Sequence, residues 1–245
     1  AKRFDRPTVV LPTSDGDIAH LSACRPRLDD RLVPALADPA ALAQLQDKQR
    51  AGELAQQAGV DAPVTRTIRA AGDLEALDAM PFPAILKPRR AQDWRTAAVR
   101  QRLGPAKGLT VTDAEAARRA YGRVSDLAPE ALVQEWVPGG DDAHLVCGAL
   151  MRPDGDLAAW ACLRKLRQYP PGIGLGCAAR LDNDPDVPKA ARAILAAAGF
   201  QGVAEVEFKR DPRDGRLRLI EVNPRLWDQH GLALRAGVDL VWLQL

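Results

Sequence analysis

Acidic and amide side chains recur at alternate positions late in the chain, in a pattern that could bind a divalent metal ion. Glu207 lies in a run at 203–208 where apolar and charged residues alternate, and Glu221 lies in a similar run at 217–222 that Asn223 follows. Side chains two positions apart share one face of a strand, so Glu221 and Asn223 should face the same way. Carboxylate and amide oxygens suit Mg²⁺, which usually shares its coordination shell with nucleotide phosphates.

The two runs should pair as an antiparallel hairpin, because the sequence Asp-Pro-Arg-Asp-Gly between them supplies turn residues. On the partner strand, Glu207 can then reach the face that carries Glu221 and Asn223. A solvated surface hairpin with exposed acidic residues would show the same alternation. The pattern alone therefore leaves both interpretations open.

The sequence Ile-Glu-Val-Asn-Pro-Arg at 220–225, together with Glu207, resembles the metal-binding signature of the ATP-grasp superfamily. Further segments are similar to that family in the same order, over nearly the whole chain. Residues 164–174, which end in Pro-Pro-Gly-Ile-Gly, resemble a branch described as D-aspartate ligase-like or carbamoyl-phosphate-synthase-like. The resemblance implies that ATP and Mg²⁺, or Mn²⁺ in its place, bind here, with Glu207, Glu221 and Asn223 as the metal ligands.

The resemblance assigns the nucleotide contacts to the first half of the chain. Lys48 and Lys87 match two family lysines, which implies contacts with the phosphates. A single lysine is usually solvated, but Lys87 lies in an apolar strand before a proline, where a charge needs a partner. The residues implied to contact adenine or ribose are Gln134, Glu135, Trp136, Val137 and Asp142. An ordinary strand end, with Asp142 solvated, is the alternative.

Basic residues in the second half are the candidates for catalysis. Lys165 and Arg167 belong to a segment that resembles the part of the family that meets substrate and γ-phosphate, and alternation predicts that they share a face. Arg225 could orient a carboxylate or acyl phosphate bidentately, with a salt bridge as the alternative. Residues 227–230 could line an acceptor pocket, or His230 could be a buried, hydrogen-bonded histidine.

The segment 86–107 departs from the family, which usually has a mobile glycine-rich loop over the phosphates here. It holds seven basic residues and one acidic residue, Asp93, and its only glycine is Gly104. Guanidinium and ammonium groups could clamp phosphates as a lid or bind an anionic substrate. A disordered basic surface loop is the alternative.

These side chains must be positioned by interleaved strands and helices, a pattern that predicts an α+β (α/β) fold. We expect a buried strand at 7–11, helices at 41–58, 73–80, 113–125 and 188–198, strands at 85–87 and 131–137, and a hairpin at 143–163. The resemblance implies an ATP-grasp fold whose two α+β lobes enclose a nucleotide cleft. It divides the chain into a remnant of an N-terminal pre-ATP-grasp α/β domain (1–40), an N-lobe with a small nucleotide lid (41–137) and a C-lobe with the metal site (138–245).

Composition sets limits on partners and location. The formal charge is +2, from 34 Lys and Arg against 32 Asp and Glu, which does not favour nucleic acid or an anionic membrane as a partner. The four cysteines show no metal-binding spacing, the first residues are too polar for a secretory signal, and no apolar run reaches the length of a membrane span. We therefore predict a soluble, cytoplasmic protein, for which a homodimer is possible.

The function implied is ATP-dependent, ADP-forming ligation of a small-molecule carboxylate to an amine, or to a thiol, through an acyl phosphate. Amino acids are candidate substrates, and the expected product has a new C–N bond. The amine needs only to be held close to the acyl phosphate, so no catalytic base is assigned. The alternatives are a nucleotide-binding regulatory protein or inactive ATP-grasp fragment, and carboxylation of the biotin-carboxylase kind.

Overall fold

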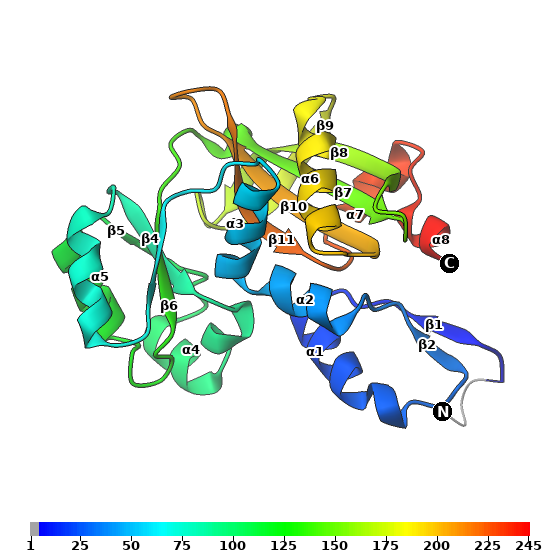
Figure 1. Cartoon of the computed structure of the whole chain (residues 1–245), viewed down its shortest axis with the longest axis horizontal. Helices are drawn as coiled ribbons and strands as arrows, with labels where there is room; N and C mark the ends of the chain where they lie inside the picture. The colour runs from blue at the N-terminus through cyan, green and yellow to red at the C-terminus, as the bar shows by residue number, and fades with distance from the viewer. Residues whose placement is uncertain (1–4) are drawn as a thin grey trace.

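The computed structural model describes residues 5–245, which form two lobes, each built around its own antiparallel sheet (Figure 1). The larger sheet has the order β11-β10-β7-β8-β9, and the smaller sheet has the order β3-β6-β4-β5. Helices pack on both sheets. The predicted α+β class is confirmed. No helix within the described residues is long and apolar enough to cross a membrane.

The larger sheet contains both predicted hairpins. Its strands are β7 (His144–Met151), β8 (Leu157–Tyr169), β9 (Leu175–Asp182), β10 (Gly202–Arg210) and β11 (Leu217–Asn223). The hairpins β7-β8 and β10-β11 are joined by pairing of β10 with β7. Because side chains alternate along β10, Ala204, Val206 and Phe208 enter the core on one face, and Glu205 and Glu207 lie on the other.

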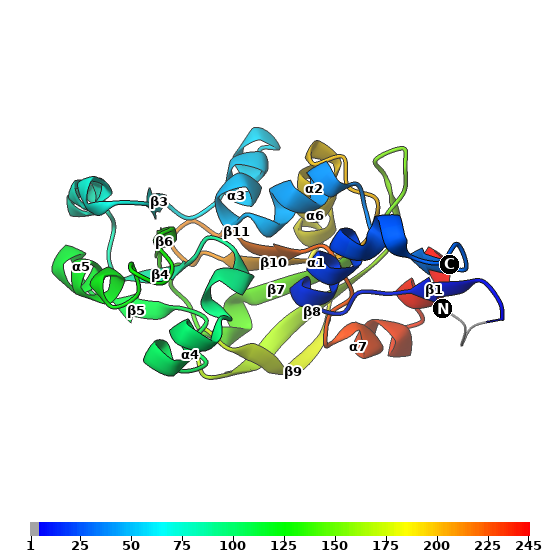
Figure 2. The same cartoon turned by 90° about the horizontal axis from the view of Figure 1, so that it is seen from below.

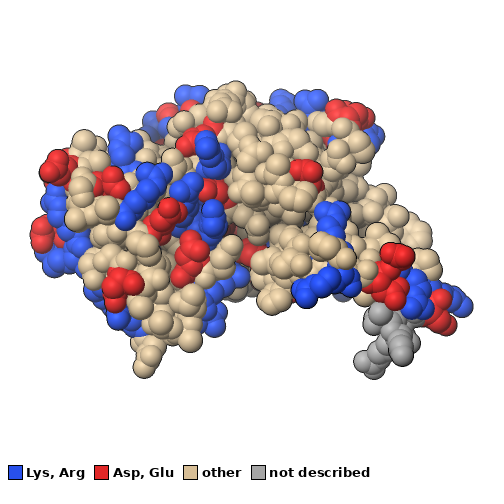
Figure 3. All heavy atoms as spheres, turned by 60° about the horizontal axis from the view of Figure 1, so that its bottom comes forward, with Lys and Arg blue, Asp and Glu red and all other residues tan. Residues whose placement is uncertain are grey.

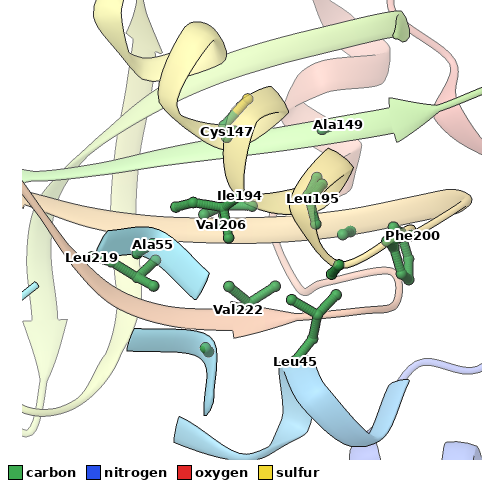
Figure 4. Close-up of a cluster of buried hydrophobic side chains, with 14 of the residues drawn as sticks. Leu45, Ala55, Cys147, Ala149, Ile194, Leu195, Phe200, Val206, Leu219 and Val222 are labelled. Atoms are coloured by element: carbon green, nitrogen blue, oxygen red, sulfur yellow. The ribbon is translucent and has the colours of Figure 1, made fainter. Parts of the chain in front are cut away.

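Three helices cover the core face of the larger sheet: α2 (Pro39–Gln46), α3 (Lys48–Gln57) and α6 (Asp186–Ala197). Figure 4 shows Leu45 of α2 and Leu195 of α6 approaching Val206 and Val222 of the sheet. Two short helices, α7 (His230–Arg235) and α8 (Leu240–Gln244), contribute to a separate cluster on the opposite face.

The prediction of a single helix at 41–58 is wrong, because the chain turns at Asp47 and forms two helices. The carboxylate of Asp47 accepts hydrogen bonds from the backbone N–H groups of Gln49 and Arg50 and so caps a new helix, α3. Its second oxygen accepts a bond from Arg89 of the small lobe. Apolar residues of α2 and α3 belong to the core of the larger sheet, whereas the predicted division groups them with the N-lobe.

The small lobe has its own core, made by residues between Ile68 and Val133. Its strands are β3 (Thr65–Ile68), β4 (Ala84–Pro88), β5 (Leu109–Val111) and β6 (Ala131–Glu135). Its helices are α4 (Ala97–Leu103), α5 (Ala114–Gly122) and the 3-10 helices Ala71–Ala79 and Ala91–Trp94. The helix predicted at 73–80 is thus a 3-10 helix. The strand predicted at 85–87 pairs on both sides and is central, as expected.

The first described residues form a small parallel pair, β1 (Thr8–Val10) with β2 (Leu32–Pro34), joined through α1 (Asp15–Cys24) and the 3-10 helix Arg25–Arg27. Figure 2 shows β1 at the end of the molecule away from the small lobe. The strand predicted at 7–11 is present as β1, but the prediction that it is buried is wrong, since Val9 is 41% exposed. Ile18 of α1 is buried in the core of the larger sheet and fixes the helix there.

Candidate active site

A cavity of about 520 Å³ lies between the two lobes and collects most of the predicted site residues. Its lining includes all of the predicted residues except Arg167 and Asp142: Lys48, Lys87, Gln134, Glu135, Trp136, Val137, Lys165, Glu207, Glu221, Asn223 and Arg225. A cleft of this size can hold a nucleotide together with part of a second substrate. Residues that are distant in sequence therefore share one site.

Four polar residues lie on the cavity face of the β10-β11 hairpin. Glu207 pairs in register with Glu221, and Glu205 pairs with Asn223. The amide nitrogen of Asn223 donates to Glu205 at 2.8 Å. Burial, and then the nearby Glu207 carboxylate, raise the pKa of Glu205 to about 8. Sequence reasoning missed Glu205, although its position two residues before Glu207 placed it on the same face.

Each carboxylate of the predicted metal site is paired with a lysine. Lys48 lies 2.8 Å from Glu221, and Lys165 donates to Glu207 at 2.5 Å. Burial alone would raise the pKa of Glu221, but Lys48, and then Lys87, outweigh it and lower that pKa to about 2. Burial likewise opposes the charge of Lys165, but Glu207 raises its pKa. Two ion pairs thus neutralise these carboxylates.

The donor chemistry of Glu207, Glu221 and Asn223 fits Mg²⁺ or Mn²⁺, because all three supply hard oxygens from one face of a hairpin. Within residues 5–245, no group of three or more His, Cys, Asp and Glu side chains is arranged to hold a metal ion. The candidate set contains two such side chains and one amide. A metal ion bound here would have to compete with Lys48 and Lys165 for the carboxylates.

Lys87 points from the central strand of the small lobe into the cavity and is almost fully buried. Its ammonium donates to the side-chain oxygen of Gln134 at 2.7 Å, and Gln134 in turn donates to Thr65. Burial, followed by repulsion from Lys48, lowers the pKa of Lys87 to about 8. Within residues 5–245, Lys87 has no carboxylate partner within ion-pair distance.

The segment predicted as an adenine hinge joins the two lobes after β6. The Glu135 carboxylate is bound by Arg213, at 2.6 Å, and by the backbone N–H of Val64. Trp136 stacks under the ammonium of Lys209, which lies 5.2 Å from the ring centroid. The Glu135 side chain therefore fastens the small lobe to the β10-β11 turn, while the hinge residues still line the cavity.

Asp142 is exposed and lies outside the cavity lining, so the predicted nucleotide contact is not supported by its position. The preceding residue, Asp141, has its carboxylate turned inward. It accepts bonds from the backbone and side chain of Gln168 and from the N–H of Gly172. Asp141 therefore anchors the loop between β8 and β9 beside the cavity.

Lys165 and Arg167 do not share a face, contrary to the prediction. The pairing of β8 with β9 shifts register on both sides of Arg167, which is a β-bulge. The bulge leaves Arg167 exposed and outside the cavity lining, whereas Lys165 and Gln168 both line it. Gln168 takes the inward position that alternation would have given to Arg167.

Three buried ring systems in the cavity lining carry nitrogens without a hydrogen-bond partner among the described residues. They are both ring nitrogens of His144 and the indole N–H groups of Trp94 and Trp227. Burial, followed by repulsion from Lys165, lowers the pKa of His144 to about 3, so its ring is neutral at physiological pH. Buried polar groups normally have partners, so these nitrogens are available to a ligand. Sequence reasoning missed His144, which no motif marks.

The basic segment 86–107 is folded rather than a disordered loop. Arg89 and Arg102 are held in ion pairs with Asp47 and Asp126 outside the cavity, whereas Arg100 and Lys107 line it. Figure 3 shows one face of the molecule, on which basic and acidic side chains are mixed over the small lobe. Only part of the positive charge counted in the sequence therefore faces the cavity.

Gly148 of β7 leaves room for the Trp227 ring, which forms part of the cavity wall. A Cβ at position 148 would lie 1.9 Å from the nearest Trp227 ring carbon. We therefore expect Gly148→Ala to displace the ring and lower the free energy of unfolding by about 2–4 kcal/mol, measured by urea denaturation. Gly122→Ala is the control, because nothing lies within 4 Å of a Cβ there. Equal stability of the two variants would contradict this packing.

Comparison with known proteins gives the following similarities. Residues 182–245 match the family model described as "Carbamoyl-phosphate synthase L chain, ATP binding domain". The D-aspartate ligase of Enterococcus faecium is 23% identical over 225 residues, which cover 89% of this chain and 53% of the ligase. The carbamoyl phosphate synthase large chain of Gemmatimonas aurantiaca is 26% identical over 251 residues, which cover 95% of this chain and 21% of that protein. The chain thus spans about half the length of the first relative and about a fifth of the second.

Two solved structures superpose on most of this chain. Biotin carboxylase from Campylobacter jejuni superposes with a TM-score of 0.74 at 14% identity, over 96% of this chain and 53% of that one. D-alanine–D-alanine ligase from Bacillus anthracis superposes with a TM-score of 0.62 at 15% identity, over 93% of this chain and 71% of that one. At these identities the likeness concerns the fold.

Proposed function

Because this chain has the ATP-grasp fold that its sequence predicted, we propose that it is an ATP-dependent, ADP-forming ligase that joins a small carboxylic acid to an amine. The activation step would form an acyl phosphate, which the amine then attacks. The observation that carries the proposal is the charge distribution of the cavity. Cationic side chains without carboxylate partners among the described residues line the same cleft as Glu207, Glu221 and Asn223, whose oxygens suit a metal ion.

The cationic side chains of the cavity that lack a carboxylate partner in the described part of the chain suit a polyphosphate. Within residues 5–245, no ion pair engages Lys87, Arg100, Lys107 or Lys209, although all four line the cavity. Phosphoryl transfer spreads negative charge over the γ-phosphate oxygens, so the cations that stabilise it must be in place beforehand. Lys48 and Lys87 are the proposed ligands of the α- and β-phosphates, from opposite lobes.

Glu207, Glu221 and Asn223 are the proposed metal ligands. When bound, Mg²⁺ supplies charge neutralisation at the β- and γ-phosphates. In its absence Lys48 and Lys165 pair with the two carboxylates. We propose that Lys48 turns to phosphate oxygens and Lys165 to the acid substrate when the metal binds. This exchange avoids leaving uncompensated charge in the cleft in either state.

Lys165 and Arg225 are the proposed contacts of the acid substrate. Arg225 already uses three of its five N–H donors, on Asp15, on the carbonyl of Leu226 and on Asn223. One donor on each terminal nitrogen is left for a carboxylate or acyl phosphate. The amine would be held beside it, where proximity supplies much of the rate.

The test is a calorimetric titration of ATP with and without Mg²⁺, followed by assays of ADP release with pools of carboxylic acids and amines. Mg-dependent binding, with ADP formed only when one acid and one amine are both present, is the expected result. ADP release that requires bicarbonate would replace ligation with carboxylation. Binding without turnover on any pool would favour a regulatory protein, and absence of binding would overturn the proposal.

Arg100 and Arg102 offer a matched test of the basic segment, because both lie on α4 but only Arg100 lines the cavity. We expect Arg100→Gln to raise the Kd for Mg-ATP about tenfold, since one charge-assisted phosphate contact is lost. Arg102→Gln removes the same charge from a pair with Asp126 and should leave the Kd unchanged. Equal effects in titration calorimetry would show that only the net charge matters.

A further inference from the structure

Asp15, at the start of α1, is connected by a chain of hydrogen bonds to the face of the β10-β11 hairpin that carries Glu205 and Asn223. Its carboxylate accepts a bond from Nε of Arg225 at 3.1 Å, although the two residues are 210 positions apart. A terminal nitrogen of the same guanidinium donates to Oδ1 of Asn223 at 3.2 Å. Asn223 then donates from Nδ2 to Glu205 at 2.8 Å. The four side chains form one continuous network.

The charges at the two ends of this network fix the orientation of the Asn223 amide. The amide oxygen meets a cation, Arg225, and the amide nitrogen meets a carboxylate, Glu205. A flipped amide would place its N–H groups against the guanidinium and its oxygen against the carboxylate, so both bonds would be lost. Because an amide oxygen has two lone pairs, one remains for a metal ion while the other accepts from Arg225.

Asp15 is well placed to hold Arg225 in this position. Both side chains are largely buried, at 10% and 13% exposed, so their pairing is weakly screened by solvent. The buried Ile18, one turn further along α1, anchors the helix in the core of the larger sheet. Asp15 also lies 3.7 Å from Arg95 of the small lobe, a longer and more exposed contact. Of the two ion pairs of Asp15, the shorter and more buried one is therefore the pair with Arg225.

We propose that Asp15 is a positioning residue for the metal site: it fixes Arg225, which in turn presents the oxygen of Asn223 to the ion. The inference rests on the proposed function, because it takes Asn223 to be a metal ligand. It extends the site to the N-terminal segment, which sequence reasoning left without a role. Asp15 acts through Arg225 and does not touch the ion itself.

Mn²⁺ binding measures this role directly and independently of turnover. Free Mn²⁺ is followed by electron paramagnetic resonance during titration of the full chain with a non-hydrolysable ATP analogue present. We expect Asp15→Asn to raise the Kd for Mn²⁺ about tenfold. In an Arg225→Gln background the same change should have no further effect, because the bond through which Asp15 acts is already absent.

Asp17→Asn is the matched control for the fold of this segment. Asp17 caps the same helix by accepting bonds from the backbone of Thr13 and Ser14, and within residues 5–245 no hydrogen bond or ion pair joins it to Arg225. Equal losses of Mn²⁺ affinity in Asp15→Asn and Asp17→Asn would reduce Asp15 to a structural anchor and overturn the inference. Unchanged Mn²⁺ affinity in Asp15→Asn would also overturn it, with the metal site intact. Absence of Mn²⁺ binding by the wild-type chain would instead refute the proposed metal site, and the inference with it.

Discussion

Lys87→Met is expected to remove ATP binding and at the same time to make the protein more stable. Burial, with repulsion from Lys48, lowers the pKa of Lys87 to about 8 from its ordinary 10.5, which means that the folded state resists the charged form. A shift of this size corresponds to about 3 kcal/mol. Methionine fills similar space without charge, and the oxygen of Gln134 left without its donor costs about 1 kcal/mol. The net gain in the free energy of unfolding is therefore about 2 kcal/mol.

The gain should depend on pH in a defined direction. Lys87 has a lower pKa in the folded than in the unfolded state, so between about pH 8 and 10.5 the unfolded chain binds more protons, and stability rises with pH. The advantage of the methionine variant is thus fully present below pH 8 and shrinks as the pH rises towards 10.5. Urea denaturation at pH 7 and pH 9.5 measures this difference.

Two measurements complete the test of Lys87. Titration calorimetry should show that the variant loses at least 100-fold in ATP affinity, because a desolvated cation no longer meets the phosphates. Lys189→Met, at an exposed position of α6, is the control and should change neither property. A less stable Lys87→Met protein, or one with normal ATP affinity, would contradict the assignment of Lys87 to the phosphates.

Glu221→Ala is expected to reduce Mg-dependent ADP formation at least 100-fold while leaving the protein folded. The substitution removes one of the two carboxylates of the proposed metal site. It also removes the ion-pair partner of Lys48, whose charge repels that of Lys87. The second effect should lower the free energy of unfolding by about 1–2 kcal/mol, because Lys48 is only partly exposed. Stopped-time ADP assays over a range of Mg²⁺ concentrations measure the first effect and urea denaturation the second.

Glu130→Ala provides the comparison for Glu221. Glu130 also pairs with a basic residue, Arg89, but it lies outside the cavity lining. Its loss should leave the Mg²⁺ dependence of ADP formation unchanged. If Glu221→Ala retained the wild-type response to Mg²⁺, the carboxylate would not be a metal ligand, and its role would be limited to the ion pair with Lys48.

Local patterns were sufficient to predict the β10-β11 hairpin. Apolar and charged residues alternate on both strands, and turn residues separate them, which predicts the antiparallel pairing. The pairing of Glu207 with Glu221 itself depends on a register shift between Glu207 and Phe208, which the pattern does not indicate. The central position of Lys87 also followed from its apolar neighbours. In such segments the short-range signal and the long-range packing agree.

The errors arose where one residue decides the geometry. A β-bulge at Arg167 changes which face of the strand the neighbouring side chains occupy. No residue type in the sequence indicates a bulge there. Asp141 and Asp142 are chemically identical neighbours, and only the path of the β8-β9 loop selects Asp141 to face inward. At Asp47 a capping side chain competes with helix-forming neighbours for the backbone.

The residues that sequence reasoning missed depend on distant segments. His144 is buried in the cavity lining of the folded chain, and no nearby residue in the sequence indicates it as a ligand. In the sequence, Asp15 is an acidic residue of the kind common at the start of a helix. Its contact with Arg225 forms only because α1 packs beside the end of β11. The burial of such groups depends on how the whole chain folds, and it cannot be predicted from a single sequence.

The two lobes have separate hydrophobic cores, and this changes what a stability measurement means. Within residues 5–245, the clusters on the larger sheet and the cluster between Ile68 and Val133 share no side chain. Cooperative unfolding requires elements that bury each other's surface, and here ion pairs such as Glu135 with Arg213 and Asp47 with Arg89 link the lobes. The small lobe can therefore melt as its own unit. A substitution such as Lys87→Met then acts on the melting of that unit alone, and a ligand held by lysines from both lobes would couple the two transitions into one.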